Sequence, residues 1–275
     1  MPDPPRYEDI TESTGVPLTP EGAEMLYTRY ALAADAAAGR RVLELGCGAA
    51  IGFGFMGERA RRLVGGDFSP ALLADARRHY DRRFPFVRLS AEQLPFRPQA
   101  FDLIVCFEAS YYVPDMDRAF GEIARVLAPG GEVLFANANP ERPDFIRSPY
   151  STHYHSADEF RTALAREGFR VHTLAGFPMA PPHGGIATRA AARALRLLRR
   201  LLEGLGLVPR TLKGRARLKR LLHRRLPVTP AELPENFAQR REPVAVLSGP
   251  VRGYKVIYVR GDKPAGAPSP RAVQR

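Results

Sequence analysis

A short apolar run near the start of the chain leads into closely spaced glycines. The segment VLELGCGAAIG spans residues 42–52 and places Gly46, Gly48 and Gly52 directly after the apolar residues. Glycines at this position let the backbone of a strand-to-helix turn approach the polar end of a bound nucleotide. The pattern therefore predicts a nucleotide-binding turn, and it leaves open which nucleotide is held.

Two acidic residues accompany this turn. Asp67 follows the next apolar run, at the distance typical of a carboxylate that accepts both hydroxyls of a ribose. Glu44 lies two residues before Gly46, where its charge would repel a pyrophosphate and attract an ammonium group. The glycine spacing is also one residue wider than the G-x-G-x-x-G pattern of dinucleotide sites. Glu44 therefore favours a nucleotide that carries a positively charged amino group.

Strand-like and helix-like segments alternate from residue 41 to residue 176. Apolar runs typical of buried strands occur at 41–46, 63–67, 86–90, 101–107, 132–139 and 169–176, with a last one at 254–261. Helical patterns lie between them at 53–62, 69–83, 116–127 and 156–168. This alternation predicts βαβ units and a mostly parallel sheet with helices on both faces.

The remaining segments define the predicted domain organisation. Residues 1–40 form an N-terminal cap region, whose helix begins at the TPEG motif and ends near Gly39. Residues 177–253 interrupt the alternation before the last strand, and the tail is low in apolar residues, which is typical of disorder. We therefore predict a cap at 1–40, a core at 41–176 with 254–261, an insertion at 177–253 and a disordered tail at 262–275.

The positive charge of the chain is confined to the insertion. The net charge is +12, and residues 186–226 alone contain 13 basic residues and one acid, so the rest of the chain is neutral. Basic residues there recur at spacings of three and four, which predicts two amphipathic helices with leucines on their other faces. The two sets are Arg189, Arg193, Arg196 and Arg200, then Lys213, Arg217, Arg220 and Arg224.

Three interpretations of these basic helices remain open. A lid subdomain would turn its leucines inward and leave its arginines in water. A contact with an anionic membrane or a lipid-linked phosphate would use the arginines directly. Nucleic acid ranks third, because no aromatic residues are interleaved for base stacking.

Cysteine content and hydropathy narrow the function classes. Cys47 and Cys106 are too few for a disulfide framework or a zinc site, and we expect them to be packing residues and the protein to hold no metal. No apolar run reaches the roughly 18 residues that span a bilayer, and the acidic, proline-rich start is unlike a signal peptide. We expect a cytoplasmic protein, with a peripheral position at the inner membrane face as the alternative.

Five segments in this order resemble the class I S-adenosylmethionine-dependent methyltransferases, in particular the small-molecule branch often labelled type 11. They are ELGCGAAIG, GGDFSPALLADAR, LSAEQLPF, FDLIVCFEASYYVPD and RVLAPGGEVLF. The resemblance covers about residues 41–176 and the last strand. It implies a Rossmann-like sheet of seven strands and S-adenosylmethionine as the cofactor. Together with the segments described above, the expected architecture adds an N-terminal helical cap and a basic helical insertion before the last strand.

The resemblance also implies which residues bind the cofactor. Glu44 and the glycines would hold its methionine end, Asp67 its ribose and Phe68 its adenine. The chain departs from the family pattern at Ala50, which replaces a glycine, and at Ser90, which replaces an acid and weakens the contact with the adenine amino group. The implied set is Tyr30, Glu44, Gly46, Gly48, Asp67, Phe68, Ala91, Glu92 and Phe107, where Tyr30 resembles the tyrosine that binds the methionine carboxylate in relatives.

Residues that handle the methyl acceptor are expected after the fourth and fifth strands. Methyl transfer mainly requires the acceptor to be held within about 3–3.5 Å and in line, and a general base is needed only for a poorly acidic hydroxyl. Tyr112 stands where many relatives carry a histidine. The candidates are therefore Tyr111, with Glu108 as an alternative, and His153 and His155 on the later loop.

These observations predict a methyltransferase that acts on a small or lipid-linked molecule. Oxygen methylation of a sugar or polysaccharide precursor is the first hypothesis. The alternatives are carbon or oxygen methylation of a quinone-type molecule, methylation of RNA, and a non-catalytic module that only binds S-adenosylmethionine.

Overall fold

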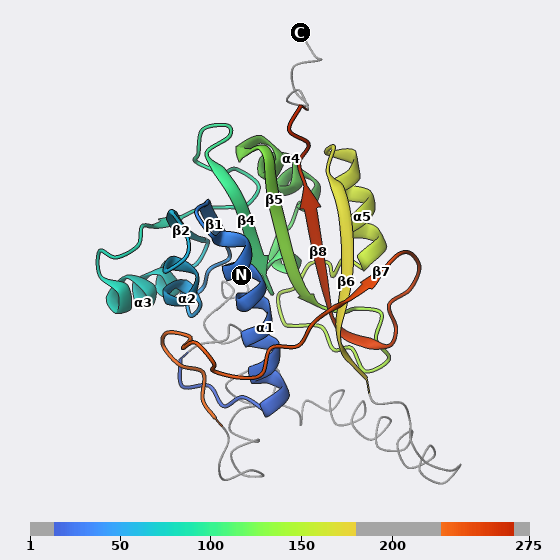
Figure 1. Cartoon of the computed structure of the whole chain (residues 1–275), viewed down its shortest axis with the longest axis horizontal. Coiled ribbons are helices and arrows are strands. Elements are labelled where there is room, and N and C mark those ends of the chain that lie inside the picture. The colour runs from blue at the N-terminus through green and yellow to red at the C-terminus, as the bar shows by residue number, and fades with distance from the viewer. Residues whose placement is uncertain (1–13, 180–226, 267–275) are drawn as a thin grey trace, which may run out of the picture.

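A single mixed sheet organises the protein. The computed structural model describes residues 14–179 and 227–266, and its strand order is β3-β2-β1-β4-β5-β8-β6-β7 (Figure 1). The strands are β1 (Arg41–Leu45), β2 (Arg62–Asp67), β3 (Phe86–Arg88), β4 (Phe101–Phe107), β5 (Leu127–Ala138), β6 (Arg170–Pro178), β7 (Val244–Val246) and β8 (Tyr254–Asp262). Strands β1 to β5 pair in parallel, whereas β8 is antiparallel to both β5 and β6.

The described residues form eight strands in this sheet, one more than the seven predicted. The eighth strand, β7, pairs with β6 at the edge of the sheet and comes from the predicted insertion. Its three residues, Val244–Val246, are too few to produce a period that could be recognised in the sequence. Strand β5 also begins earlier than predicted, because Leu127 already pairs with Phe101 before the register shifts.

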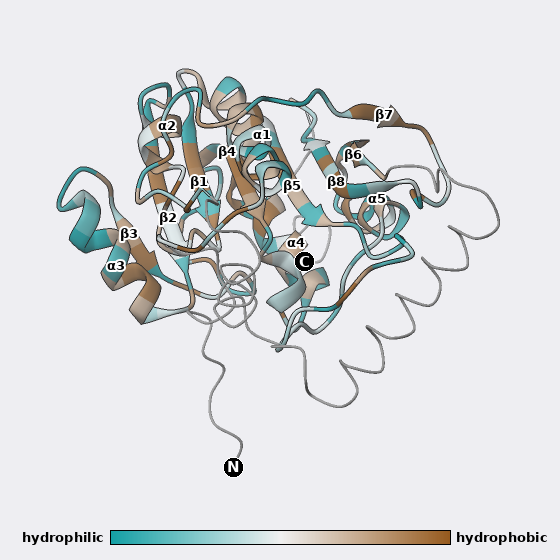
Figure 2. Cartoon of the chain, turned by 90° about the horizontal axis from the view of Figure 1, so that it is seen from below, coloured by the Kyte–Doolittle hydropathy of each residue, from teal (hydrophilic) through white to brown (hydrophobic). Residues whose placement is uncertain are grey.

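Helices cover both faces of the sheet, as predicted. Helices α1 (Pro20–Ala37), α2 (Phe53–Gly57) and α3 (Pro70–Tyr80) pack on one face, and α4 (Met116–Val126) and α5 (Ala157–Arg166) pack on the other. In Figure 1, α1 crosses in front of the sheet, and the apolar residues in Figure 2 concentrate on the strands between the two layers.

Strand β4 shows how the sequence supplies both layers. Leu103, Val105 and Phe107 belong to the core beneath α1, whereas Ile104 and Cys106 belong to the core beneath α4 and α5. Successive side chains of a strand point to opposite faces, so a strand with two covered faces is apolar along its covered length, here from Leu103 to Phe107.

Side-chain caps fix where the helices begin. The hydroxyls of Thr19, Ser69 and Ser156 accept backbone N–H groups in the first turns of α1, α3 and α5. The Glu159 carboxylate accepts the backbone N–H of Ser156 and completes a capping box. Asp115 caps α4 in the same way. The caps of α3, α4 and α5 mark where the loops after β2, β4 and β5 end.

The described part of the predicted insertion packs back onto the core. Residues 227–253 consist of turns, bends and β7, and Leu233 is buried with its backbone N–H donated to the Ile51 carbonyl at 2.8 Å. The two predicted basic helices at 186–226 lie outside the described residues, as does the end of the tail from residue 267. Strands β6 and β8 each run slightly beyond the predicted core bounds, to Pro178 and Asp262.

Candidate active site

The turn after β1 adopts a conformation that favours glycine. Gly46, Gly48 and Ala50 all have positive φ, at 71°, 55° and 61°. A Cβ on Gly46 would lie 2.3 Å from the Cβ of Ala109 in the loop after β4, so only glycine fits there. The left-handed conformation of Ala50 explains why a glycine is usual at that position, since a non-glycine residue there carries strain.

Glu44 is the most deeply buried acid at this turn. Its side chain is 1% exposed, and Oε1 accepts a hydrogen bond of 2.9 Å from the Tyr30 hydroxyl. Oε2 is buried and has no hydrogen-bond partner among residues 14–179 and 227–266. Burial raises the pKa of Glu44 to about 8, although Tyr30 and the charge of Arg29 act to lower it. A buried carboxylate with one unpaired oxygen is a costly arrangement that a cationic donor would relieve.

Tyr30 connects helix α1 to this carboxylate. Its ring packs edge-on against Phe107 at a centroid distance of 5.4 Å and fills the space next to Gly52, where a Cβ would overlap it. The single hydroxyl proton of Tyr30 is donated to Glu44. In this structure, therefore, Tyr30 orients Glu44.

Asp67 joins the glycine turn to helix α3. Its Oδ2 accepts the backbone N–H of Gly48, and its Oδ1 accepts that of Ser69, both at 2.8 Å. A carboxylate can accept about four hydrogen bonds, so this bridging role is compatible with binding ribose hydroxyls. The neighbouring Phe68 exposes 59% of its surface, and the Arg88 guanidinium lies 5.7 Å from its ring centroid.

The LSAEQLPF segment is held by its own side chains. The Ser90 hydroxyl donates to Glu92 Oε2 at 3.2 Å and accepts the Glu92 backbone N–H. Glu92 Oε1 accepts the backbone N–H of Asp115 at 2.8 Å, which ties this segment to the cap of α4. Ala91 packs against the core beneath α4 and α5. Both oxygens of Glu92 thus hold this segment in place, and as in Asp67 each can still accept a further hydrogen bond.

The loop after β4 holds a carboxylate beside stacked tyrosines. Glu108 adopts a positive φ of 49° and receives the Tyr111 hydroxyl on Oε2 at 2.9 Å. Tyr111 stacks on Tyr154 with ring centroids 4.0 Å apart, and burial raises the pKa of its phenol well above the usual range. Tyr111 is therefore a neutral hydrogen-bond donor that positions Glu108, and its raised pKa makes it a poor general base.

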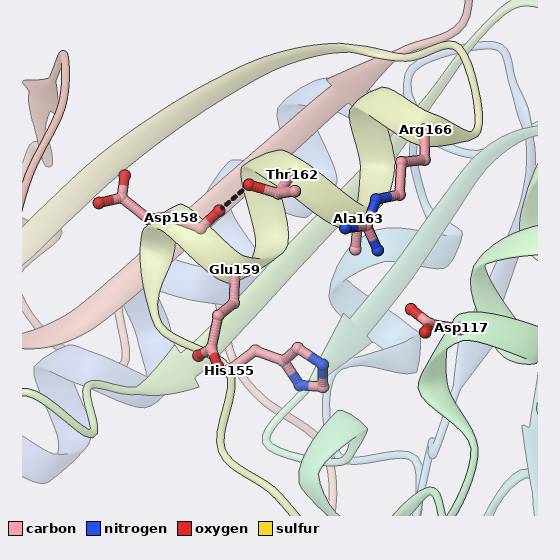
Figure 3. A pocket seen from close by; sticks show the side chains of 7 residues that line it. All are labelled: Asp117, His155, Asp158, Glu159, Thr162, Ala163 and Arg166. Carbon is pink, nitrogen blue, oxygen red and sulfur yellow. Dashed lines mark hydrogen bonds between the residues drawn. The ribbon is translucent and has the colours of Figure 1, made fainter.

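The two predicted histidines lie elsewhere. The exposed imidazole of His153 contacts Glu159 in the first turn of α5 at 3.1 Å. His155 packs against the rings of Phe120 and Phe160, and burial lowers its pKa. It lines a hollow of ≈ 330 Å³ between α4 and α5 (Figure 3), whose other lining residues are Asp117, Asp158, Glu159, Thr162, Ala163 and Arg166. These helices cover the face opposite Tyr30, so neither histidine joins the group around Glu44.

Contacts around the glycine turn bring most of the predicted cofactor residues together. Tyr30 contacts both Glu44 and Phe107, and the backbone N–H of Gly48 donates a hydrogen bond to Asp67. Sequence reasoning missed Arg29, a buried cation whose charge acts on Glu44, and Tyr258, whose buried hydroxyl has no hydrogen-bond partner in the described parts of the chain. The signal for Tyr258 was available, because it is the one phenol within the apolar run VIYV.

Known proteins match this chain over the same region. A family model described as a methyltransferase domain, of type 11, matches residues 43–135. The demethylmenaquinone methyltransferase of Thermus thermophilus is 34% identical over 174 residues, which cover 61% of this chain and 77% of that protein. The chain belongs to the class I S-adenosylmethionine-dependent methyltransferases. The cofactor of this methyltransferase is S-adenosylmethionine.

Other relatives match smaller shares of their length. A probable S-adenosylmethionine-dependent methyltransferase of Mycolicibacterium smegmatis is 32% identical over 56% of this chain, which spans 60% of that protein. The fatty-acid O-methyltransferase of the same organism is 36% identical over 46% of the chain, which spans 48% of that enzyme. The methyltransferase described here thus spans about half to three-fifths of these two relatives.

Solved structures show the same fold. YcgJ of Bacillus subtilis superposes with a TM-score of 0.56 at 21% identity, over 87% of this methyltransferase and 100% of that chain. The cyclase SpnF superposes with a TM-score of 0.56 at 17% identity, over 94% and 90% of the two chains. In the ranges 14–179 and 227–266 of the methyltransferase, no helix combines the length and hydrophobicity that crossing a bilayer requires.

Proposed function

We propose that this methyltransferase transfers a methyl group to an oxygen atom of a lipid or lipid-linked acceptor. Two relatives support the acceptor class by their names, since one is a fatty-acid O-methyltransferase and another acts on demethylmenaquinone. Both named acceptors are lipids, so we place a lipid ahead of a sugar precursor. The single structural observation that supports methyl transfer is the buried, unpaired Oε2 of Glu44 at the carboxyl end of β1, which fits the cofactor, whereas the lipid acceptor rests on the names of the relatives.

The residues around Glu44 fit S-adenosylmethionine. Glu44 Oε2 would accept a hydrogen bond from the ammonium group of the methionine part, which is the cationic donor that the buried oxygen lacks. Gly46 and Gly48 keep the backbone free of side chains where that part would lie. Asp67 would accept the ribose hydroxyls, and the exposed ring of Phe68 would pack on the adenine beside Ala91. In this arrangement Tyr30 acts on the cofactor through Glu44.

When bound, S-adenosylmethionine supplies an electrophilic methyl group on its sulfonium sulfur. The task of the protein is to fix the cofactor and hold the acceptor oxygen in line at about 3–3.5 Å. Tyr30 and Phe107 form an apolar wall beside Glu44, which keeps water from the reacting atoms. The loops after β4 and β5 supply the acceptor side, as expected from their position at the carboxyl edge of the sheet.

Glu108 is our candidate for receiving the acceptor proton. It is held by the Tyr111 hydroxyl on the loop that follows β4 and packs against the glycine turn through Ala109 and Gly46. We infer that this pair faces the acceptor, whereas His153 and His155 serve the packing of α5. A general base of this kind is needed for a hydroxyl acceptor but not for a carboxylate, which is already ionised near neutral pH.

Membrane contact through residues 186–226 remains a further proposal. The described residues that flank this segment support it by their position. Pro178 pairs with Tyr254 at the start of β8, and the N–H of Leu18 donates to the Pro227 carbonyl just before α1. The Lys255–Glu21 ion pair of 2.6 Å joins these two places. Both ends of the segment therefore lie on the side of the sheet where the parallel strands end, which is also the side of Glu44. An anionic lipid surface there would present an acceptor to the site.

Labelled methyl transfer tests the proposed function. The full chain is incubated with methyl-labelled S-adenosylmethionine and a cell extract that is then divided into lipid, RNA and water-soluble fractions. We expect the label in the lipid fraction, and we expect Glu44→Gln to reduce it strongly at a cofactor concentration below saturation. Label confined to RNA or to water-soluble molecules would reject a lipid acceptor, and absence of label in every fraction would favour a non-catalytic role.

A further inference from the structure

The Tyr258 side chain is completely enclosed and its hydroxyl is unpaired. It lies in the middle of β8 with 0% exposure, and its hydroxyl has no hydrogen-bond partner among the described residues. Gly176 on β6 makes room for the ring, since a Cβ there would lie 2.8 Å from Tyr258 Cε2. Burying an unpaired hydroxyl costs free energy that phenylalanine would avoid. Within the part of the chain that the structure describes, the hydroxyl therefore lacks an acceptor that a bound molecule would supply.

Strand register places Tyr258 beside the group already described. Phe107, Ala136 and Tyr258 are successive neighbours on β4, β5 and β8, and all three belong to the core beneath α1. Phe107 packs on Tyr30, which holds Glu44. Tyr258 thus shares the face of the sheet with Glu44 but lies on its β5 and β8 side, where an acceptor would bind.

Two charges act on the Tyr258 hydroxyl. Burial raises its pKa, the cation of Arg29 opposes this rise, and the carboxylate of Glu108 adds to it. Arg29 also acts on Glu44, and Glu108 is the carboxylate held by Tyr111. The hydroxyl is therefore close enough to feel both the charge of Arg29, on the proposed cofactor side, and that of Glu108, on the proposed acceptor side. A phenol in these surroundings stays protonated and can donate a hydrogen bond.

We propose that the Tyr258 hydroxyl donates a hydrogen bond to the acceptor oxygen that receives the methyl group. This inference rests on the proposed function and adds a specificity residue to it, because an acceptor carbon or an ammonium nitrogen could not accept this bond. A carboxylate or a quinol oxygen would satisfy it equally. The acceptor oxygen forms the new bond to the methyl carbon while the bond to sulfur breaks and its electron pair stays on sulfur. Tyr258 keeps its proton throughout.

The test compares Tyr258→Phe with Tyr254→Phe. Tyr254 lies on the same strand but packs against the opposite core, so it is a matched control. Calorimetry measures S-adenosylhomocysteine binding first, then binding of palmitate and of 1,4-naphthoquinol to the protein loaded with S-adenosylhomocysteine. We expect S-adenosylhomocysteine affinity within twofold of wild type in both variants. We expect Tyr258→Phe, but not Tyr254→Phe, to bind one of the two probes at least tenfold more weakly than wild type. Weaker binding of palmitate would indicate a carboxylate acceptor, and weaker binding of 1,4-naphthoquinol would indicate a quinol acceptor.

Stability measurements exclude a merely structural role. Because the Tyr258 hydroxyl is unpaired, urea unfolding of Tyr258→Phe should show a midpoint equal to or higher than that of wild type. A lower midpoint would show that the hydroxyl serves folding and would overturn the proposal. Unchanged probe affinity in Tyr258→Phe, or failure of wild type to bind either probe, would overturn it as well. Failure of wild type to bind S-adenosylhomocysteine would instead reject the proposed function itself.

Discussion

The Tyr30 hydroxyl donates a 2.9 Å hydrogen bond to Glu44 Oε1, and Glu44 Oε2 is left buried without a partner among the described residues. One residue of helix α1 thereby fixes the orientation of a carboxylate at the end of β1. Burying the unpaired oxygen costs free energy, and a bound cationic donor would offset this cost. The cap helix is therefore part of the proposed cofactor site.

Replacing Glu44 with glutamine should weaken cofactor binding strongly. The change removes a charge-assisted hydrogen bond worth about 1.5–3 kcal/mol, so we expect about 10- to 100-fold weaker binding of S-adenosylhomocysteine by calorimetry. Glu132→Gln is the matched control, because Glu132 is also buried but pairs with Arg40 and Arg260 away from the glycine turn. Equal affinities of the two variants would reject Glu44 as the ammonium ligand.

The raised pKa of Glu44 predicts a specific pH dependence of stability. Its folded-state value is about 8 against an ordinary value of 4.5. The folded protein without cofactor therefore keeps a proton that the unfolded chain releases above about pH 4.5. The contribution of Glu44 to the free energy of unfolding is fully present below that pH and is lost as the pH rises through about 8. Urea unfolding at pH 5.5 and 8.5 should show this loss in wild type and a smaller one in Glu44→Gln.

The same pKa predicts that cofactor binding releases a proton. At pH 7 the buried Glu44 is mostly protonated, whereas the ammonium group requires the ionised form. Calorimetry of S-adenosylhomocysteine binding in two buffers of different ionisation enthalpy should therefore show proton release by wild type and none by Glu44→Gln. Identical proton release by both proteins would assign the proton to another group.

Tyr30→Phe should separate the role of the tyrosine from that of the carboxylate. Without its hydrogen bond, the pKa of Glu44 should rise further, so affinity for S-adenosylhomocysteine should fall at pH 7 and recover in part at pH 9. Tyr27→Phe is the control, because Tyr27 lies on the same helix but its hydroxyl accepts the N–H of Asn236. A pH-independent loss in Tyr30→Phe would instead indicate a direct contact with the cofactor.

The histidine and glutamate variants should differ in methyl transfer. His153→Ala and His155→Ala should keep activity within about threefold of wild type, because His153 contacts Glu159 of α5 and His155 packs against Phe120 and Phe160. Glu108→Gln should lower kcat at least tenfold for a hydroxyl acceptor, in line with the usual contribution of a general base. If kcat fell in a histidine variant and stayed at the wild-type value in Glu108→Gln, the assignment of the base would be reversed.

The sequence predicted the sheet well because long apolar runs report burial directly. The runs at β1, β2 and β4 required two covered faces, and Thr19, Ser69 and Ser156 marked helix starts by their capping chemistry. The cofactor turn was equally accessible, because positive φ at Gly46 and Gly48 selects glycine.

Other features depend on tertiary geometry and were not predictable. The three residues of β7 carry no period, and their pairing with β6 arises only from the path of the chain. His155 was a reasonable base by its loop position, but the face that a loop side chain selects depends on packing against Phe120 and Phe160. Whether the Tyr258 hydroxyl finds a partner is likewise decided by neighbours far away in the sequence.

Membrane binding through residues 186–226 should depend on anionic lipid. Each basic residue close to such a surface contributes about 1 kcal/mol, and salt screens this attraction. Vesicles with phosphatidylglycerol should therefore pellet the full chain at low salt, whereas pure phosphatidylcholine vesicles should not. Pelleting should be abolished when glutamine replaces four arginines of the segment, namely Arg189, Arg193, Arg196 and Arg200. It should persist when glutamine replaces four exposed arginines outside the segment, namely Arg61, Arg78, Arg82 and Arg97. If both variants pelleted equally, or if wild type did not pellet at low salt, membrane binding through residues 186–226 would be rejected.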